Sequence, residues 1–228
     1  MIKKLQALKA KKGFTLVELI VVIAIIGVLA AILVPTLLGV VTKSRVTSAN
    51  STAASIKTAI DSFLTDADAD GYGMKAVSTN VDKLTASVDG TGKWEVTLEN
   101  AADHFKKRST SNGEVAWEAS VNGVTAGTAR NSANGGTGLL AQSLADTFPD
   151  MKRTSFVAYL VGGQNCVFVV YTADTSAVTE LEAEITGNSL WDDTNKTYAK
   201  TSAWDGRNAG IGGDQGFTVG TNPVVGMD

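Results

Sequence analysis

The sequence predicts an α+β protein in which a long N-terminal α-helix packs on the antiparallel β-sheet of a globular head. Three observations predict this fold. Residues 14–41 are almost wholly apolar and carry a single charge, which indicates a helix able to cross a bilayer. Residues 42–65 keep the helical spacing but place apolar side chains on one stripe only. The rest of the chain contains short apolar runs of strand length, separated by stretches rich in glycine, asparagine and serine.

Length and charge limit the classes of protein that fit. The chain has 228 residues, enough for one sizeable domain with its own core. The formal net charge is −3, but five lysines precede Phe14, and the remaining chain holds 15 basic and 23 acidic residues. Such an acidic body does not favour binding to a nucleic acid, whose phosphates require clustered lysine and arginine. Cys166 is the only cysteine, so no disulfide closes within the chain.

The first 41 residues divide into a basic leader, residues 1–13, and an apolar segment, residues 14–41. As a helix, the apolar segment would be roughly 42 Å long, against about 30 Å of hydrocarbon in a bilayer. Lysines gather before it, which predicts a cytoplasmic N-terminus and a head on the far side of the membrane. We therefore expect three parts: the leader, a long helix over residues 14–65, and a head over residues 66–228.

A secretory signal peptide and a plain membrane anchor are the alternatives for this apolar segment. A signal peptide has the same basic start, but its apolar region is usually about 7–15 residues long and ends at a small-residue cleavage site. Here Ala30 and Ala31 are followed by more apolar chain. A plain anchor fits the length, yet it leaves Gly13 and the carboxylate of Glu18 without a role.

Residues 13–20, Gly-Phe-Thr-Leu-Val-Glu-Leu-Ile, follow a lysine-rich leader and resemble the N-terminus of type IV pilins and their pseudopilin relatives. The resemblance covers residues 11–40 and leaves the head unassigned. It implies that a prepilin peptidase cuts between Gly13 and Phe14, and that the new terminal Phe14 is N-methylated. Glu18 then becomes the fifth residue of the mature chain, the position expected in the family. An assembly ATPase and a membrane platform protein are the further partners that the resemblance implies.

Glu18 has two interpretations. It lies about 6 Å along a helix that starts at Phe14, near the membrane interface and on the electropositive first turn. It is therefore either an interfacial carboxylate that reaches water or an assembly residue. In the second interpretation, the free amine of Phe14 pairs with Glu18 of a neighbouring copy, and the pair gains strength where water is excluded. The resemblance implies that such a pair sets the axial register between subunits.

Small and helix-breaking residues interrupt the apolar segment. Pro35 lacks a backbone N–H and clashes with the preceding turn, so we expect it to kink or locally break the helix, with Gly39 loosening it further. Pro35 is either a proline that a membrane helix tolerates or a residue with a role in filament packing. By resemblance, helices of the family commonly carry a proline and a glycine at the places of Pro35 and Gly27. Gly27 and Ala31 also form a small-xxx-small pair, a weak signal for close helix packing.

Beyond Val41 the helical pattern becomes amphipathic and is expected to run to Thr65, with one stripe that a sheet must cover. The members of this stripe are Val46, Ala49, Ala53, Ile56, Ile60 and Phe63.

After the helix, Asp66, Asp68 and Asp70 have the spacing of the first ligands of a calcium loop. The twelfth position of that loop is Val77, where a bidentate glutamate is needed. A plain acidic turn is therefore favoured, and calcium is the only cofactor that the sequence suggests.

The head is predicted to be mixed. The clearest hairpin joins residues 155–161 to residues 166–172, and because both runs are nearly all apolar, we expect central strands covered on both faces. The other predicted strands are residues 94–98, 115–121 and 217–219. Helices are predicted over residues 99–107 and 139–147, and residues 178–185 fit either a helix or a strand. The predicted loops are residues 122–138 and 205–216.

The sequence offers little catalytic chemistry. His104 is the only histidine, and no recognised nucleophile motif accompanies it, so a solvated position on a surface helix is favoured. Cys166 falls inside an apolar strand, where an inert buried thiol is the common case. The glycine run at residues 210–213 follows no convincing strand and opens no helix, so it is not a nucleotide-binding fingerprint. The basic cluster Lys106–Arg108 is favoured as a solvated face.

These observations favour a structural protein and not an enzyme: a subunit of a type IV pilus. We expect a precursor held in the lipid of the cytoplasmic membrane, then cleaved and polymerised with its own copies into an extracellular filament for adhesion, motility or a related surface function. Open-ended contacts between identical subunits generate such filaments. One alternative is a pseudopilin of a type II secretion or DNA-uptake system. An alternative of another class is a membrane-anchored extracytoplasmic binding or enzymatic domain.

Overall fold

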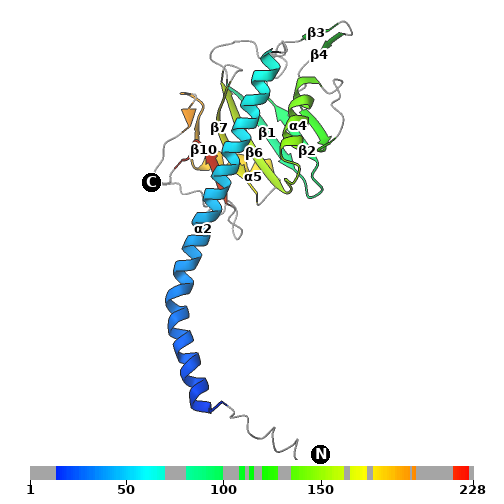
Figure 1. The fold of residues 1–228 in the computed structure, drawn as a ribbon. Coiled ribbons are helices and arrows are strands. Elements are labelled where there is room, and N and C mark those ends of the chain that lie inside the picture. Colours follow the sequence, from blue (N-terminus) through cyan, green and yellow to red (C-terminus); the bar gives the residue numbers. More distant parts are fainter. Residues whose placement is uncertain are drawn as a thin grey trace, which may run out of the picture. The chain divides into compact units, whose positions relative to one another are not determined.

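The computed structural model of the protein (Figure 1) describes residues 14–69, 81–99, 108–110, 113–115, 120–127, 135–161, 165–173, 177–195, 197–198 and 218–225. The chain divides into two compact units, residues 1–44 and residues 45–228. The described part of the first unit comprises Phe14, Thr15 and the beginning of helix α2 (Leu16–Ala69). The second unit holds the remaining residues of α2 and all other described elements.

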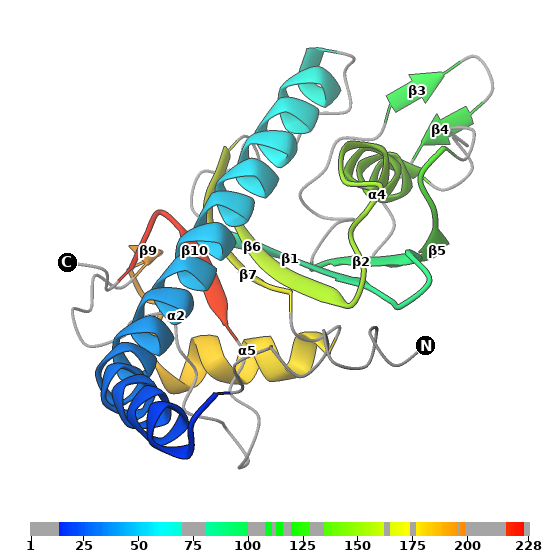
Figure 2. The same cartoon turned by 60° about the horizontal axis from the view of Figure 1, so that its bottom comes forward.

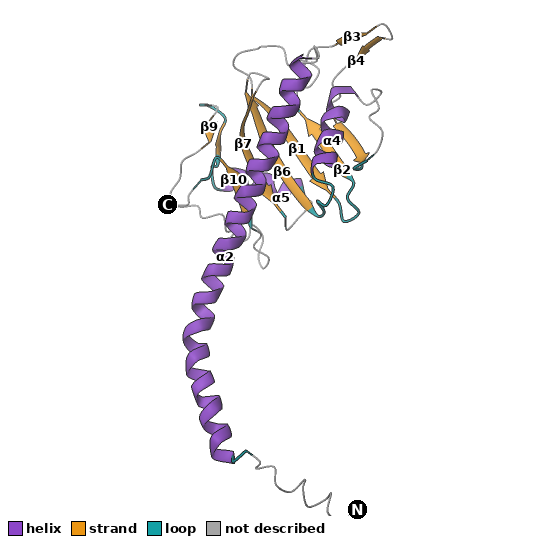
Figure 3. Ribbon diagram, in the orientation of Figure 1, coloured by secondary structure: helices purple, strands orange, loops and turns teal. Residues whose placement is uncertain are grey.

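The second unit is built around a six-stranded antiparallel sheet with the strand order β10-β7-β6-β1-β2-β5 (Figure 3). Its strands are β1 (Val81–Val88), β2 (Trp94–Leu98), β5 (Ser120–Val124), β6 (Thr154–Val161), β7 (Asn165–Thr172) and β10 (Val219–Asn222). Two short ribbons accompany it, β3 (Arg108–Thr110) with β4 (Gly113–Val115), and β8 (Trp191–Asp192) with β9 (Thr197–Tyr198).

Helices cover both faces of the sheet, as Figures 1 and 2 show. The second half of α2 and helix α4 (Gly135–Thr147) share one hydrophobic core with the sheet, and helix α5 (Val178–Gly187) shares a separate core on the other face. Strand β6 alternates between the two cores: Phe156 and Ala158 belong to the first, Val157 and Tyr159 to the second. The central strands are therefore covered on both faces, as their nearly continuous apolar sequence predicts.

The apolar stripe of α2 binds the helix to this sheet. Ile56 and Ile60 are fully buried there, and full burial of such a side chain contributes about 1.5–3 kcal/mol. The predicted stripe is confirmed except at its end, where Leu64 occupies the core and Phe63 is only partly buried. The rotation of a regular helix brings residue 64, four after Ile60, onto the same face.

Two polar side chains of α2 also hold the sheet. The Asn50 side-chain carbonyl accepts a hydrogen bond from the backbone N–H of Thr221 in β10, at 2.7 Å. The Asp61 carboxylate accepts one from the backbone N–H of Cys166 in β7, at 2.7 Å, and forms an ion pair with Lys57 at 2.6 Å. A buried N–H without an acceptor is costly. These bonds therefore fix where α2 crosses two strands that are more than one hundred residues away in sequence.

Helix α2 differs from the sequence-based expectation at two places. It continues without a break through Pro35 and Gly39, so the predicted local break is absent. Proline removes only the one N–H that would bond the carbonyl of Ala31, and its fixed φ is a helical value, so the neighbouring turns continue across it. The helix also ends at Ala69 instead of Thr65, because Ala67 is still buried in the core and extends the packed stripe by one turn.

Most head elements follow the predictions, with shifted bounds. The hairpin of β6 and β7 and strand β2 are confirmed, and residues 178–187 are helical. The run predicted at 115–121 contains the end of β4 and the start of β5, and the strand predicted at 217–219 is β10, which begins at Val219. Helix α4 begins at Gly135, four residues before its predicted start, and β5 extends to Val124, both inside the predicted loop 122–138. Of the helix predicted over residues 99–107, Glu99 lies in a turn and the rest lies outside the described residues, as does the loop 205–216.

Strand β1 was not predicted. It pairs with β6 on one side and β2 on the other, so it is central to the sheet. Its buried face consists of Asp82, Leu84, Ala86 and Val88. Aspartate and alanine are both uncommon in strands, and they weaken a signal that the strict alternation of buried and partly buried positions would otherwise provide.

Substitution of Gly220 by alanine is expected to destabilise the head strongly. A Cβ at this position would lie 2.1 Å from the backbone carbonyl carbon of Ala49, so β10 and α2 would have to separate. Overpacking of this kind costs about 3 kcal/mol, which corresponds to a fall in melting temperature of roughly 6–12 °C for a domain of this size. Near-ultraviolet circular dichroism of the full chain in detergent measures this fall.

The matched control for this variant is Gly90→Ala. Its added Cβ would meet the flexible Arg153 side chain at 3.4 Å, an ordinary contact. We expect its melting temperature to stay within about 2 °C of the unsubstituted protein, because exposed substitutions usually have small effects. Equal melting temperatures for the Gly220 and Gly90 variants would contradict the close approach of β10 to α2.

Candidate assembly site at the start of helix α2

The first turn of α2 is closed by a reciprocal pair of side chains. Thr15 precedes the helix, and its backbone carbonyl accepts the N–H of Leu19 at 3.2 Å. The Thr15 hydroxyl accepts the N–H of Glu18 at 3.2 Å, while Glu18 Oε2 accepts the backbone N–H and the hydroxyl of Thr15, at 2.8 and 2.7 Å. This arrangement is a capping box, which satisfies two of the N–H groups that a helix start leaves without partners.

The capping box leaves one oxygen of the Glu18 carboxylate available. All three hydrogen bonds between the two residues involve Oε2 or the Thr15 hydroxyl, and Oε1 accepts no hydrogen bond from the residues that the structure describes. An ionised carboxylate can accept bonds at both oxygens. Glu18 can therefore cap its own helix and bind a cation from another molecule at the same time.

The segment after Glu18 is apolar and uncovered. Phe14 is 83% exposed and Leu16 is 72% exposed, and the large side chains from Leu19 to Val41 are exposed in the same way. Within the described residues, α2 is the one helix long and apolar enough to cross a membrane. An exposed apolar surface of this extent marks a place where a protein meets lipid or another chain.

The glycines of this segment lie in open surroundings. A Cβ added at Gly27 or Gly39 would meet no atom within 4 Å. Neither glycine is therefore required by packing within the described part of the chain. Small residues on an apolar helix allow a second helix to approach closely, so Gly27 is suited to a contact between molecules. Gly13, the predicted cleavage residue, lies outside the described residues.

Comparison with known proteins identifies this N-terminal segment. Residues 8–34 match the family model described as the prokaryotic N-terminal methylation motif. The resemblance to type IV pilins is thereby confirmed. The matched residues include Gly13, Phe14 and Glu18 and end just before Pro35.

Several relatives are fimbrial proteins or pilins by name. A fimbrial protein of Pseudomonas aeruginosa is 35% identical over 105 residues, which is 42% of this chain and 64% of that protein. Fimbrial protein Q of Moraxella bovis is 40% identical over 86 residues, or 38% of this chain and 55% of the relative. The type IV major alpha-pilin of Moraxella bovis is 49% identical over 57 residues, or 25% of this chain and 36% of the relative. The chain thus spans less than two thirds of the length of these relatives, and no solved structure matches it.

The capping box is the feature of the prepilin-like segment that sequence reasoning missed. Its signal was present, because Thr15-Leu-Val-Glu18 has the spacing of a capping threonine followed three residues later by a glutamate. The expected position of Glu18 on the first turn of the helix is confirmed. The carboxylate therefore has a partner in its own chain as well as the predicted role between chains.

The predicted calcium ligands do not form a loop where they are described. Asp66 and Asp68 lie in the last turn of α2, where residues two apart point about 200° away from each other around the helix axis. Their carboxylates therefore do not converge on one cation in the manner of the first two ligands of a calcium loop. Asp70 lies outside the described residues. Calcium binding stays a prediction, and the helical positions of Asp66 and Asp68 argue against it.

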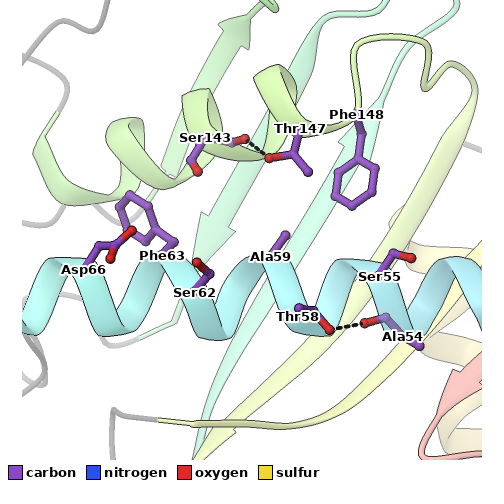
Figure 4. Close-up of a pocket in the computed structure, with 10 residues that line it drawn as sticks. All are labelled: Ala54, Ser55, Thr58, Ala59, Ser62, Phe63, Asp66, Ser143, Thr147 and Phe148. Atoms are coloured by element: carbon purple, nitrogen blue, oxygen red, sulfur yellow. Dashed lines mark hydrogen bonds between the residues drawn. The ribbon is translucent and has the colours of Figure 1, made fainter.

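The head contains an open groove between α2 and α4, with a volume of about 500 Å³. Figure 4 shows its lining of small and hydroxyl-bearing side chains from both helices, together with the aromatic side chains of Phe63 and Phe148. Thr147 and Thr58 each donate their hydroxyl to a carbonyl of their own helix, at 2.7 and 3.0 Å. Among the described residues of this lining, Asp66 is the one that carries a carboxylate. The lining residues therefore suit contact with another surface better than they suit catalysis, which requires paired reactive groups.

Cys166 takes the position that the sequence predicts, inside a central strand. Burial raises the pKa of its thiol well above the ordinary value, and the nearby Asp61 carboxylate adds to this shift. The thiol therefore stays protonated and unreactive at neutral pH. His104, Lys106 and Lys107 lie outside the described residues; Arg108 begins strand β3.

Removal of the threonine hydroxyl at position 15 is expected to loosen the first turn of α2. Loss of a capping side chain costs about 1 kcal/mol, so the amides of Thr15 and Glu18 should exchange roughly fivefold faster in Thr15→Ala. Hydrogen–deuterium exchange of the full chain in detergent micelles measures this change. Thr15→Ser keeps the hydroxyl and serves as the control with unchanged exchange. Equal protection in both variants would show that the capping box does not close the helix.

Proposed function

We propose that the protein is the structural subunit of a type IV pilus, which polymerises through the first half of α2. The observation that carries this proposal is the apolar surface from Phe14 to Val41, which nothing in the described chain covers and which begins with a prokaryotic methylation motif. Burial of that surface against lipid and then against other copies removes it from water, which is favourable. The fimbrial and pilin names of the relatives support the same assignment.

The life cycle that follows has a membrane stage and a filament stage. The precursor spans the cytoplasmic membrane with the basic residues 1–13 on the cytoplasmic side. A prepilin peptidase removes the leader after Gly13, and Phe14 becomes the methylated N-terminus. An assembly ATPase and a platform protein then move the subunit into a helical filament outside the cell. The protein itself supplies contact surfaces and carries out no catalysis in this scheme.

Glu18 gives the polymer its register. After cleavage, the terminal amine of Phe14 is a cation on an apolar helix end, and the free Oε1 of Glu18 on a neighbouring copy is its acceptor. In a water-poor filament core, at an effective dielectric constant near 20, such a pair 4 Å apart is worth about 4 kcal/mol. Because the capping bonds of Glu18 use Oε2, the helix start remains intact while the pair forms.

Mass spectrometry of the mature N-terminus tests the proposed processing. We expect a chain that begins at Phe14, with the mass of one added methyl group, in the membrane and in the fibres. An intact leader, or a cut at another residue, would favour a membrane-anchored extracytoplasmic domain.

Labelling of the head on intact cells should reveal long fibres. Label that remains within the cell envelope would favour a pseudopilus.

Variants of Glu18 separate its two roles. Glu18→Ala loses both the cap and the charge, whereas Glu18→Gln keeps an oxygen that can cap the helix but carries no charge. We expect insertion and leader cleavage to continue in both, and fibre yield to fall at least tenfold in both because the ion pair is lost. Immunoblots of sheared fibres and of membrane fractions measure the two quantities.

The control for these variants is Thr15→Ala, which keeps the carboxylate and removes part of the cap. It should produce fibres at close to the unsubstituted level. Normal fibre yield from Glu18→Ala would exclude a role for the carboxylate in assembly. Normal yield from Glu18→Gln with loss in Glu18→Ala would assign the role to capping instead of charge.

A further inference from the structure

Four aromatic rings form a two-layer stack on the face of the sheet that α5 covers. The inner layer is the cross-strand pair of Tyr159 in β6 and Phe168 in β7. The outer layer is the cross-strand pair of Trp191 in β8 and Tyr198 in β9. Trp191 stacks on Tyr159 with ring centroids 4.1 Å apart, and Tyr198 stacks on Phe168 at 5.4 Å.

The outer pair, Trp191 and Tyr198, presents two roughly parallel rings, and we name this pair the aromatic platform. The Trp191 and Tyr198 rings both lie within 16° of the plane of Phe168, so they face the same way. The inner rings are buried, whereas the outer rings are partly exposed. The inner layer thus covers one face of each outer ring, and both outer residues keep part of their surface exposed.

The platform is held rigidly. The Trp191 indole N–H donates to Asp193 Oδ1 at 2.9 Å, which fixes the orientation of that ring. The adjoining turn is fixed by Asp192, whose Oδ1 accepts the backbone N–H groups of Thr194 and Asn195 at 2.8 and 3.0 Å. A rigid aromatic surface loses little conformational entropy when it binds a ligand. This rigid pair of rings is therefore better suited to binding a ligand than a flexible loop would be.

Polar groups border one end of the platform. Asp193, Thr194 and Asn195 are exposed in the turn between β8 and β9, and they offer carboxylate, hydroxyl and amide groups beside the rings. Binding sites for uncharged organic ligands combine such a few polar groups with an aromatic surface. A ligand that fits has a flat apolar face and a rim of hydroxyl groups, which describes a pyranose ring.

The charges around the stack disfavour other ligand classes. Among the described residues near the stack, Lys83 is paired with both Glu99 and Glu182, each at 2.8 Å, and Asp193 adds a negative charge that disfavours an anion. Burial raises the pKa of Tyr159 to about 12, so its hydroxyl is neutral. A quaternary ammonium group is held by rings that enclose it, whereas Trp191 and Tyr198 each lie within 16° of the plane of Phe168 and so do not face each other across a cage.

We propose that the aromatic platform of Trp191 and Tyr198 binds neutral saccharides. The site is separate from the polymerisation helix, so it does not depend on the proposed pilus function. Several pyranose rings of one glycan can span the two aromatic rings, with the polar turn accepting hydrogen bonds from ring hydroxyls.

Calorimetric titration of the full chain tests this site. The protein is held in a detergent without a sugar headgroup, and the probes are maltohexaose, cellohexaose and N-acetylchitohexaose. We expect at least one of them to bind, and Trp191→Ala to weaken that binding roughly tenfold, because an aromatic stacking contact is lost. Tyr198→Phe keeps the ring and should bind within about twofold of the unsubstituted protein.

Melting temperatures of the variants show whether a loss of binding comes only from a destabilised head. If Trp191→Ala lowers the melting temperature of the head, Trp191→Phe retains a ring in the stack and should weaken binding by about threefold. Absence of binding to all three probes would overturn the proposal. Unchanged binding in Trp191→Phe and Trp191→Ala would also overturn it, as would displacement of the saccharide by choline, which would assign the platform to cations.

Discussion

An apolar helix surface without a cover in its own chain is the constraint on which the rest of the molecule depends. Phe14 and the large apolar side chains of α2 from Leu16 to Val41 are exposed, so this segment requires either lipid or other protein molecules around it. The same helix from Arg45 onward is instead amphipathic and binds the sheet through one stripe. One continuous helix thus connects a part that needs partners to a part that folds on itself.

The second half of α2 is fixed to the sheet by apolar and polar contacts that act together. Ile56 and Ile60 supply burial, while Asn50 and Asp61 supply acceptors for N–H groups of β10 and β7. Apolar burial has no direction, so it does not by itself determine where along the helix each strand lies. The two hydrogen bonds and the close approach of Gly220 to Ala49 determine that register.

The sequence predicted the elements whose signal is local. The apolar segment, the amphipathic stripe, the β6–β7 hairpin and the prepilin-like motif all depend on neighbouring residues. Strand β1 was missed because its buried face includes Asp82 and Ala86, whose places depend on β2 and β6. The early start of α4 at glycines 135 and 136 was missed because burial there overrides low helix propensity. Nor could the sequence reveal the aromatic stack, since it joins residues from four separate strands.

The capping box also bears on the entropy of subunit association. A free glutamate side chain must give up rotational freedom to form an ion pair, at a cost of up to about 2 kcal/mol. Glu18 has already given up that freedom within its own subunit, because Thr15 holds its carboxylate through two hydrogen bonds. The acceptor is thus pre-organised before any neighbour arrives. In the proposed pilus, a subunit that leaves the membrane would carry a docking group that is already in position.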